Sequence, residues 1–273
     1  MNKENVFDKI ESFRHRDVDK KDGLVRIMTS NIYYTLDETE EETEKRMEIL
    51  GGYYMRFLPD FLGLQEVSRR SRPLLLKQIS EKYAYTQVIE GKSNYTPLMY
   101  RKDLYDVLET DFKIFEGHDG SMWSYQWALY SSKEVREKQI IHMNLHYHFA
   151  STETRLKDAE EVNRKIKELM KKYPTAPIFV TGDYNCGVST PEFKAMCEGI
   201  KLNSGMLLTD DNDGYKSFWH HPGEYEIAED TEEIDHICVT EERARVVLHR
   251  KIRDRFICIE GSDHCPVYID VEI

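Results

Sequence analysis

Oxygen-bearing side chains recur where short apolar segments of this sequence end. Asn31 follows the segment VRIMTS, Glu66 follows FLGLQ, and Asp263 lies in GSDH. Magnesium takes hard oxygen ligands and is commonly held by one or two carboxylates together with phosphate oxygens of a substrate. Glu66 and Asp263, assisted by Asn31, therefore suit a divalent-metal site that acts on a phosphate ester.

A second group of residues suits proton transfer or phosphate contact. Asp183 and Asn185 lie in TGDYN, and His264 follows directly after the aspartate of GSDH. A carboxylate bonded to one imidazole nitrogen fixes the tautomer and favours the charged ring, which leaves the other nitrogen to donate to a phosphate oxygen. Each motif alone also has a structural interpretation, because Asp-x-Asn commonly forms turns and an isolated histidine is more often a surface residue.

The elements that must position these residues follow an α/β pattern. Apolar runs of four to eight residues alternate with longer segments of helical period. The expected strands are 24–28, 61–64, 95–100, 127–130, 138–144, 178–181, 237–239 and 267–271. The expected helices are 42–57, 70–82 and 153–172, and a short helix begins where Thr190 can cap and Pro191 takes the first position. The acidic stretch 203–233 is interpreted as a surface loop.

The length of the chain limits the number of domains, and its charge limits the kinds of partner it can bind. At 273 residues the chain can bury one large core, and we expect an N-terminal extension over 1–23 and a single domain over 24–273. A formal net charge of -12 argues against tight non-specific binding to nucleic acid, because that affinity comes from cationic side chains. It does not exclude a nuclease, since a bound metal and a local basic patch can outweigh the global charge near a site.

The cysteines and the apolar runs bear on location. The five cysteines are odd in number and include no CxxC pair, which favours reduced thiols and a cytoplasmic protein. No stretch has the roughly 18 consecutive apolar residues of a membrane span, so we expect no membrane anchor. Nothing in the sequence implies a protein partner.

Five short motifs occur in a distinctive order, SN (30–31), LQE (64–66), GDYN (182–185), IDH (234–236) and SDHCPV (262–267). Their order resembles the endonuclease/exonuclease/phosphatase superfamily, a group of pancreatic deoxyribonuclease-like, metal-dependent phosphohydrolases. The resemblance covers nearly the whole chain from residue 24. It implies an α/β fold that is a four-layer α/β/β/α sandwich of two packed mixed β-sheets with helices on both outer faces. It also implies a bound Mg²⁺ ion, with Mn²⁺ as a possible substitute.

Carried over position by position, the resemblance implies a role for each motif residue. The residues it places at the metal are Asn31, Glu66 and Asp263. The residues it places in catalysis are Asp183, which orients or deprotonates the attacking water, Asn185, His146 and His264, which contact the scissile phosphate, and Asp235, which supports them.

Two positions depart from the family pattern. The segment NLHYH replaces Asn-Thr-His-Leu-Asp, so His146 occupies the phosphate-binding position but His148 stands where the family has an acid. This exchange alters the hydrogen-bonded support of the ring. Asn94 stands where family members often have an acidic residue before a tyrosine, which here is Tyr95. These departures leave open a non-catalytic binding module on the same fold.

Three further residues are expected to contact substrate, namely Tyr95, Arg155 and Trp123. Trp123 lines the cleft or packs a loop onto the sheet, and Arg155 is either an active-site neighbour or a surface residue in the first turn of a helix. The aromatic and histidine cluster 218–221 is a further candidate for the cleft wall. 

We expect the substrate to be a small phosphodiester or phosphomonoester, such as a sugar, inositol or lipid headgroup phosphate, because the acidic chain has no obvious basic stripe. The main alternative is a metal-dependent nuclease, which would lose affinity steeply with added salt.

Overall fold

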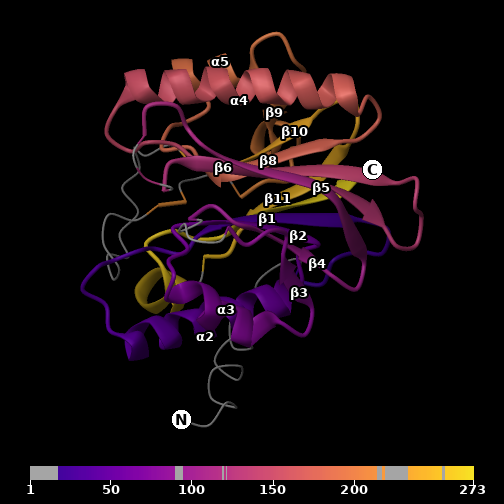
Figure 1. Cartoon of the computed structure of the whole chain (residues 1–273). Coiled ribbons are helices and arrows are strands. Elements are labelled where there is room, and N and C mark those ends of the chain that lie inside the picture. The colour runs from indigo at the N-terminus through magenta and orange to yellow at the C-terminus, as the bar shows by residue number, and fades with distance from the viewer. Residues whose placement is uncertain are drawn as a thin grey trace.

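The chain forms four layers in which two β-sheets pack face to face between two layers of helices (Figure 1). The computed structural model describes residues 18–89, 95–118, 120, 122–213, 217–218, 233–253 and 256–273, with the backbone alone at 258 and 259. Helices α2 (Glu40–Phe57) and α3 (Ser71–Ile79) cover one sheet, and α4 (Thr152–Lys172) and α5 (Pro191–Cys197) cover the other. The predicted α/β/β/α sandwich is confirmed.

Both sheets have six strands and mixed direction. The first sheet has the order β11 (Arg245–Lys251), β12 (Val267–Glu272), β1 (Val25–Asn31), β2 (Phe61–Gln65), β4 (Leu98–Arg101) and β3 (Tyr83–Tyr85). The second has the order β5 (Tyr105–Ile114), β6 (Ser124–Ser132), β7 (Gln139–His146), β8 (Ile178–Asp183), β10 (Asp235–Thr240) and β9 (Leu202–Ser204). Short η1 (Gly205–Leu207) and η2 (Ile257–Gly261) helices complete the described elements.

Strand register brings the chemically active side chains to one edge of the sandwich. In the first sheet, β1 and β2 are parallel and Asn31 is paired with Gln65 at their carboxyl ends. In the second sheet, β7 and β8 are parallel and end with His146 paired to Asp183, while antiparallel β10 begins with Asp235 opposite Asp183. Because carboxyl ends of parallel strands meet at the same edge, four strand ends from two sheets converge there.

Polar groups near this edge bring the two sheets into close contact. Gln65 Nε2 donates to Asn144 Oδ1 across the interface at 2.6 Å, and Asn144 Nδ2 donates to the Leu64 carbonyl at 2.7 Å. A Cβ added to Gly63 would meet Thr181 Oγ1 at 2.0 Å and Asn144 Oδ1 at 2.5 Å. Only a residue without a side chain therefore fits at position 63.

The helix starts follow local sequence signals. The Thr39 side chain accepts from the Glu42 amide and the Glu42 side chain accepts from the Thr39 amide, so α2 begins with a capping box. Ser151 caps α4, and Thr190 caps α5 ahead of Pro191, as predicted. Helix α4 begins one residue before its predicted start, and helix α2 begins two residues before its predicted start. Helix α3 ends three residues before its predicted end.

Several strands were not predicted. Strands β3, β5, β9 and β11 lie outside the expected set, and β5 lacks an apolar run because much of it is exposed, including half of the surface of Leu108. The expected strand 95–100 begins only at Leu98, after Pro97, which has no amide hydrogen to donate to a ladder. The interpretation of 203–233 as a surface loop is confirmed at 210–212, which are exposed, and is wrong at 203–207, which form the end of β9 and η1, and at Ser217 and Glu233, which are buried.

The N-terminal boundary at residue 23 stays a prediction. Residues 1–17 of the expected extension lie outside the described residues. Arg26, fully buried, pairs with Asp270 through Nε at 2.6 Å and donates from Nη1 to the Val18 carbonyl at 2.6 Å. Among the described residues, no helix is long and apolar enough to span a bilayer.

We expect Gly63→Ala to lower the free energy of unfolding by about 1 to 3 kcal/mol or more, because the new methyl group overpacks the sheet interface. Chemical denaturation measured by circular dichroism would test this. Gly120→Ala is the matched control, since a Cβ there meets nothing within 4 Å. Equal stability of the two variants would contradict the close approach of the sheets.

Candidate active site

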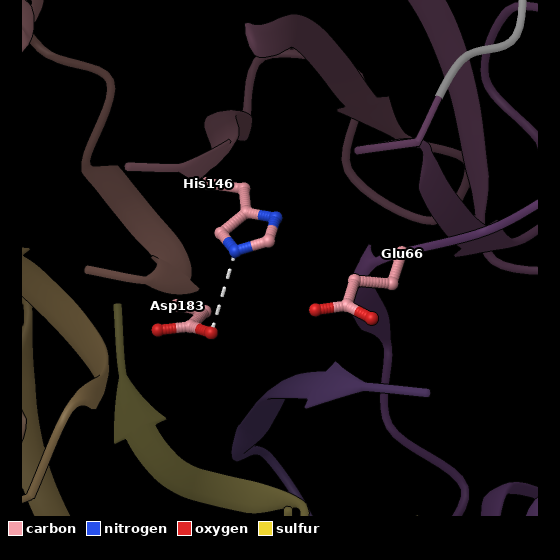
Figure 2. A group of neighbouring side chains, drawn as sticks. All are labelled: Glu66, His146 and Asp183. Carbon is pink, nitrogen blue, oxygen red and sulfur yellow. Dashed lines mark ion pairs between the residues drawn. The ribbon is translucent and has the colours of Figure 1, made fainter. Parts of the chain in front are cut away.

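Asp183 lies at the centre of the cluster at the converging strand ends. Its Oδ2 atom is 3.1 Å from Asn31 Nδ2, 3.5 Å from His146 Nε2 and 3.8 Å from His264 Nε2. Figure 2 shows Asp183 and His146 facing each other, with Glu66 reaching toward them from the first sheet. One carboxylate therefore joins side chains from both sheets.

Glu66 is held at the mouth of the cluster by the loop after β1. Its Oε1 accepts from Asn31 Nδ2 at 3.0 Å and its Oε2 accepts from the Tyr34 amide at 2.6 Å. The Asn31 oxygen accepts from the Tyr33 amide at 3.0 Å, so this side chain bridges two carboxylates through its nitrogen. Both Tyr33, at φ 59°, and Glu66, at φ 62°, adopt the left-handed conformation, which is costly for residues other than glycine.

A partly buried ion pair fixes that loop. Arg46 on α2 binds Glu38 through Nε and through Nη2, the latter at 2.7 Å, and also donates to the carbonyls of Ile32, Tyr33 and Gly261. The carbonyl of Gly261 lies just before the SDHCPV motif. This arginine was not predicted as a site residue, because its partners are one carboxylate and three backbone carbonyls that only the fold brings together.

His264 is bound on one side by a carboxylate. Its Nδ1 lies 2.8 Å from Asp235 Oδ2, and the same oxygen accepts from Ser217 Oγ at 2.5 Å. The bond to Asp235 fixes the ring so that Nε2 faces Asp183. Ser217 was not predicted, since it lies 18 residues before Asp235 in a stretch without pattern.

The charges of the cluster are strongly perturbed. Burial, together with the charge of Asp235, raises the pKa of the Asp183 carboxyl well above its ordinary value. Burial lowers the pKa of His146 to about 4, against the opposing charge of Glu66. Burial also lowers the pKa of His264, but the charges of Asp235 and Asp263 outweigh this effect. The pKa of His264 is therefore well above its ordinary value. His146 is therefore the neutral ring and His264 the charged one.

The donor set fits a hard divalent cation. Within the described part of the chain, two groups have ligand atoms within 4.8 Å of one another, namely Glu66, His146 and Asp183, and Asp183, Asp235 and His264. Asp263 lies beside them with 14% of its side chain exposed, and the charge of Glu66 adds to the effect of burial in raising its pKa. Closely spaced carboxylates that raise one another's pKa are stabilised by a cation with oxygen ligands.

Aromatic rings flank His146. Trp123 lies edge-on to its ring at a centroid distance of 4.7 Å, and His148 lies 4.9 Å from Trp123. Among the described residues, no group hydrogen-bonds to His146 Nδ1, which is buried. Beyond His148, the ring of Phe149 is 66% exposed and lies 5.8 Å from Trp123. The altered flank of His146 thus forms an aromatic wall, defined as Trp123, His148 and Phe149.

The structure places the other predicted site residues around this cluster. Asn185, at φ 49°, donates from Nδ2 to the Tyr147 carbonyl at 2.9 Å, and its amide bonds Asp183 Oδ1 at 2.9 Å. Arg155 pairs with Glu192 at 2.9 Å and donates to the Phe149 carbonyl at 2.9 Å, so it supports the loop that carries the aromatic wall.

Two further predicted residues pack against residues at the site. Tyr95 packs edge-on to Tyr34 at 5.6 Å. The ring of Phe218 packs on the ring of His264 with a centroid distance of 4.7 Å. Asn94, Trp219, His220 and His221 lie outside the described residues. The individual roles assigned to the site residues stay predictions.

Comparison with known proteins gives a consistent fold. The model of the endonuclease/exonuclease/phosphatase family matches residues 28–264. A Bacteroides vulgatus endonuclease/exonuclease/phosphatase is similar with a TM-score of 0.76 and 22% identity, covering 92% of this chain and 99% of that one. A Bacteroides thetaiotaomicron mannosyl-6-phosphatase has a TM-score of 0.77 and 19% identity, covering 91% and 100%.

A nucleic-acid enzyme is also among the similar structures. TDP2 from D. rerio, complexed with a single-strand DNA product, has a TM-score of 0.72 and 16% identity, covering 92% of this chain and 100% of that one. A search of curated proteins found no match. At these identities the solved structures establish a shared fold and leave the substrate to be argued from the site.

We expect Asp235→Asn to lower the pKa of His264 toward its ordinary value, because the closest carboxylate that favours the charged ring is removed. Histidine resonances of metal-free protein, titrated by NMR, would measure the change. Asp106→Asn, which removes an exposed carboxylate on β5, is the control. An unchanged titration of His264 in the Asp235 variant would show that this ion pair does not set its charge.

Proposed function

Because this chain belongs to the endonuclease/exonuclease/phosphatase family, we propose that it is a divalent-metal-dependent phosphohydrolase acting on a small phosphate ester. The observation that carries the proposal is the buried Asp183 carboxylate, which lies within 4 Å of two imidazole nitrogens and the Asn31 amide at the edge where the two sheets meet. A carboxylate in this position can direct water toward a phosphate held by its neighbours. The two imidazole rings are the neighbours that could hold the phosphate.

We propose that Glu66 and Asp263 hold Mg²⁺, which Mn²⁺ could replace, with Asn31 and Asp183 adjoining the ion. Oxygen donors of this kind suit either cation. A bound ion would polarise a phosphoryl oxygen and offset its developing negative charge. Partial exposure of both carboxylates is consistent with this role, because the ion must also accept water and substrate oxygens.

The proposed reaction is attack of water on phosphorus. Asp183 orients the water and accepts its proton, a role that its raised pKa favours because a base is most effective near the working pH. His264, held by Asp235, donates from Nε2 to a phosphate oxygen, and neutral His146 binds another. Asn185 is proposed to complete the phosphate contacts from its position beside Asp183.

Two features support a small substrate over nucleic acid. The chain carries a formal net charge of -12, whereas a nuclease needs cations along a phosphate backbone. Trp123 and the exposed Phe149 ring offer an apolar wall beside His146, which suits the carbon face of a sugar or polyol. The mannosyl-6-phosphatase shares this fold, as does the DNA-bound TDP2, so a nuclease remains the alternative.

Hydrolysis of an aryl phosphomonoester and an aryl phosphodiester, with Mg²⁺, with Mn²⁺ and with chelator, tests the proposal. We expect metal-dependent turnover that falls by about 10²-fold or more in Glu66→Gln and in Asp183→Asn, because each loses a charged oxygen at the reacting centre. Glu153→Gln, an exposed change on α4, is the matched control. Turnover that survives both chelator and Asp183→Asn would overturn the mechanism, and metal-dependent product release would exclude a non-catalytic module.

Salt dependence separates the two substrate classes. Between about 50 and 200 mM salt, a protein that contacts about six to ten phosphates loses about 10³-fold to 10⁵-fold in affinity. We expect kcat/KM for the preferred aryl ester to change by less than about 10-fold over this range. A single-stranded oligonucleotide that is cleaved faster than the aryl esters, with a steep loss on adding salt, would favour the nuclease.

A further inference from the structure

A separate cavity of about 250 Å³ opens beside the proposed metal ligand Glu66. It lies between the loop after β1, which contributes Tyr33 and Tyr34, and the loop after β2, which contributes Ser68. Tyr34, one of the lining residues, donates from its backbone amide to Glu66 Oε2 at 2.6 Å. A group in this cavity would therefore lie next to a phosphate bound at the metal.

The cavity is rich in positive charge on an otherwise acidic chain. Arg46, Arg69 and Arg70 line it, and Glu38 is the one acidic side chain among the described lining residues. Arg46 binds both carboxylate oxygens of Glu38, so these two charges offset each other and the net positive charge of the lining comes from Arg69 and Arg70. Arg69 and Arg70 are exposed to solvent, and the charge of Arg70 acts on the Tyr34 phenol within the cavity.

The lining chemistry suits a compact anion attached to a carbon skeleton. Guanidinium groups bind phosphate through charge-assisted hydrogen bonds, and serine and tyrosine hydroxyls add neutral donors. Tyr34 and Tyr95 meet edge-on at 5.6 Å and present ring surface to the carbon atoms of a ligand. The volume admits one small group and excludes a nucleic-acid duplex.

We propose that this cavity binds a second, non-scissile phosphate of the substrate, while the scissile phosphate lies at Glu66 and Asp183. The preferred substrate class is then a small sugar or polyol that carries two phosphate groups. This inference rests on the proposed function for the scissile phosphate. Whether the cavity binds an anion is tested separately, by measuring ligand binding to metal-free protein that does not turn the ligand over.

Calorimetric titration of metal-free protein with glucose 1,6-bisphosphate and with glucose 6-phosphate is the first measurement. We expect the bisphosphate to bind at least about 10-fold more tightly, the difference expected from one charge-assisted contact. The double variant Arg69→Ala/Arg70→Ala should lose this preference, and Arg69→Lys/Arg70→Lys should recover part of it. Equal affinity of wild-type protein for both ligands would overturn the proposal.

The matched control is Arg136→Ala/Arg164→Ala, which removes two exposed arginines outside the cavity. We expect it to keep the preference for the bisphosphate. Loss of the preference in this control as well would assign the effect to the charge of the whole protein and reject the cavity as a site.

A turnover measurement separates this proposal from the proposed function. With metal present, the ratio of kcat/KM for the bisphosphate to that for p-nitrophenyl phosphate should fall by about 10-fold in Arg69→Ala/Arg70→Ala. If wild-type protein turns over neither compound while the calorimetric preference persists, the hydrolase is rejected and the anion site stands. If both compounds are hydrolysed and the ratio is unchanged by the variant, the cavity is rejected and the hydrolase stands.

Discussion

Repulsion among carboxylates brought together at one buried edge is the constraint on which the rest of the site depends. Glu66, Asp183, Asp235 and Asp263 converge there, and burial with neighbouring charge raises the pKa of Asp183. Ionised groups so close are stable only with compensating positive charge. The charged His264 supplies part of it, and a divalent cation is the natural source of the remainder. The repulsion that destabilises the cluster would be relieved by a bound cation, which in turn could hold a phosphate.

The scaffold meets that demand by fixing each group through a neighbour that does not itself react. Asn31 joins two carboxylates, Ser217 bonds Asp235, and the Arg46 and Glu38 pair holds the loop whose amide bonds Glu66. Preorganised groups need no rearrangement when charge develops in a reaction. The close approach of the sheets at Gly63 extends this rigidity into the core.

Under the proposed function, substrate choice would depend on two surfaces beside the cluster. The aromatic wall of Trp123, His148 and Phe149 lies beside His146, and the arginine-lined cavity lies beside Glu66. One side offers apolar contact and the other offers positive charge. A phosphate ester held between them would be selected by its carbon skeleton and by any second anionic group. Its scissile phosphate would lie at Glu66 and Asp183.

The sequence by itself determined the α/β class, the family and the principal polar residues, because apolar periodicity and motif order are local properties of the chain. It placed Asp183 and Asn185 at a strand end and in the loop that follows it, where the structure has them, whereas His264 lies between η2 and the start of β12 instead of after a strand. Only the tertiary structure decided that Ser217 bonds Asp235, that Arg46 fixes the loop beside Glu66, and that an arginine cavity opens there. These contacts join segments distant in sequence, and no local pattern marks a hydrogen bond whose partner is brought near only by the packing of two sheets.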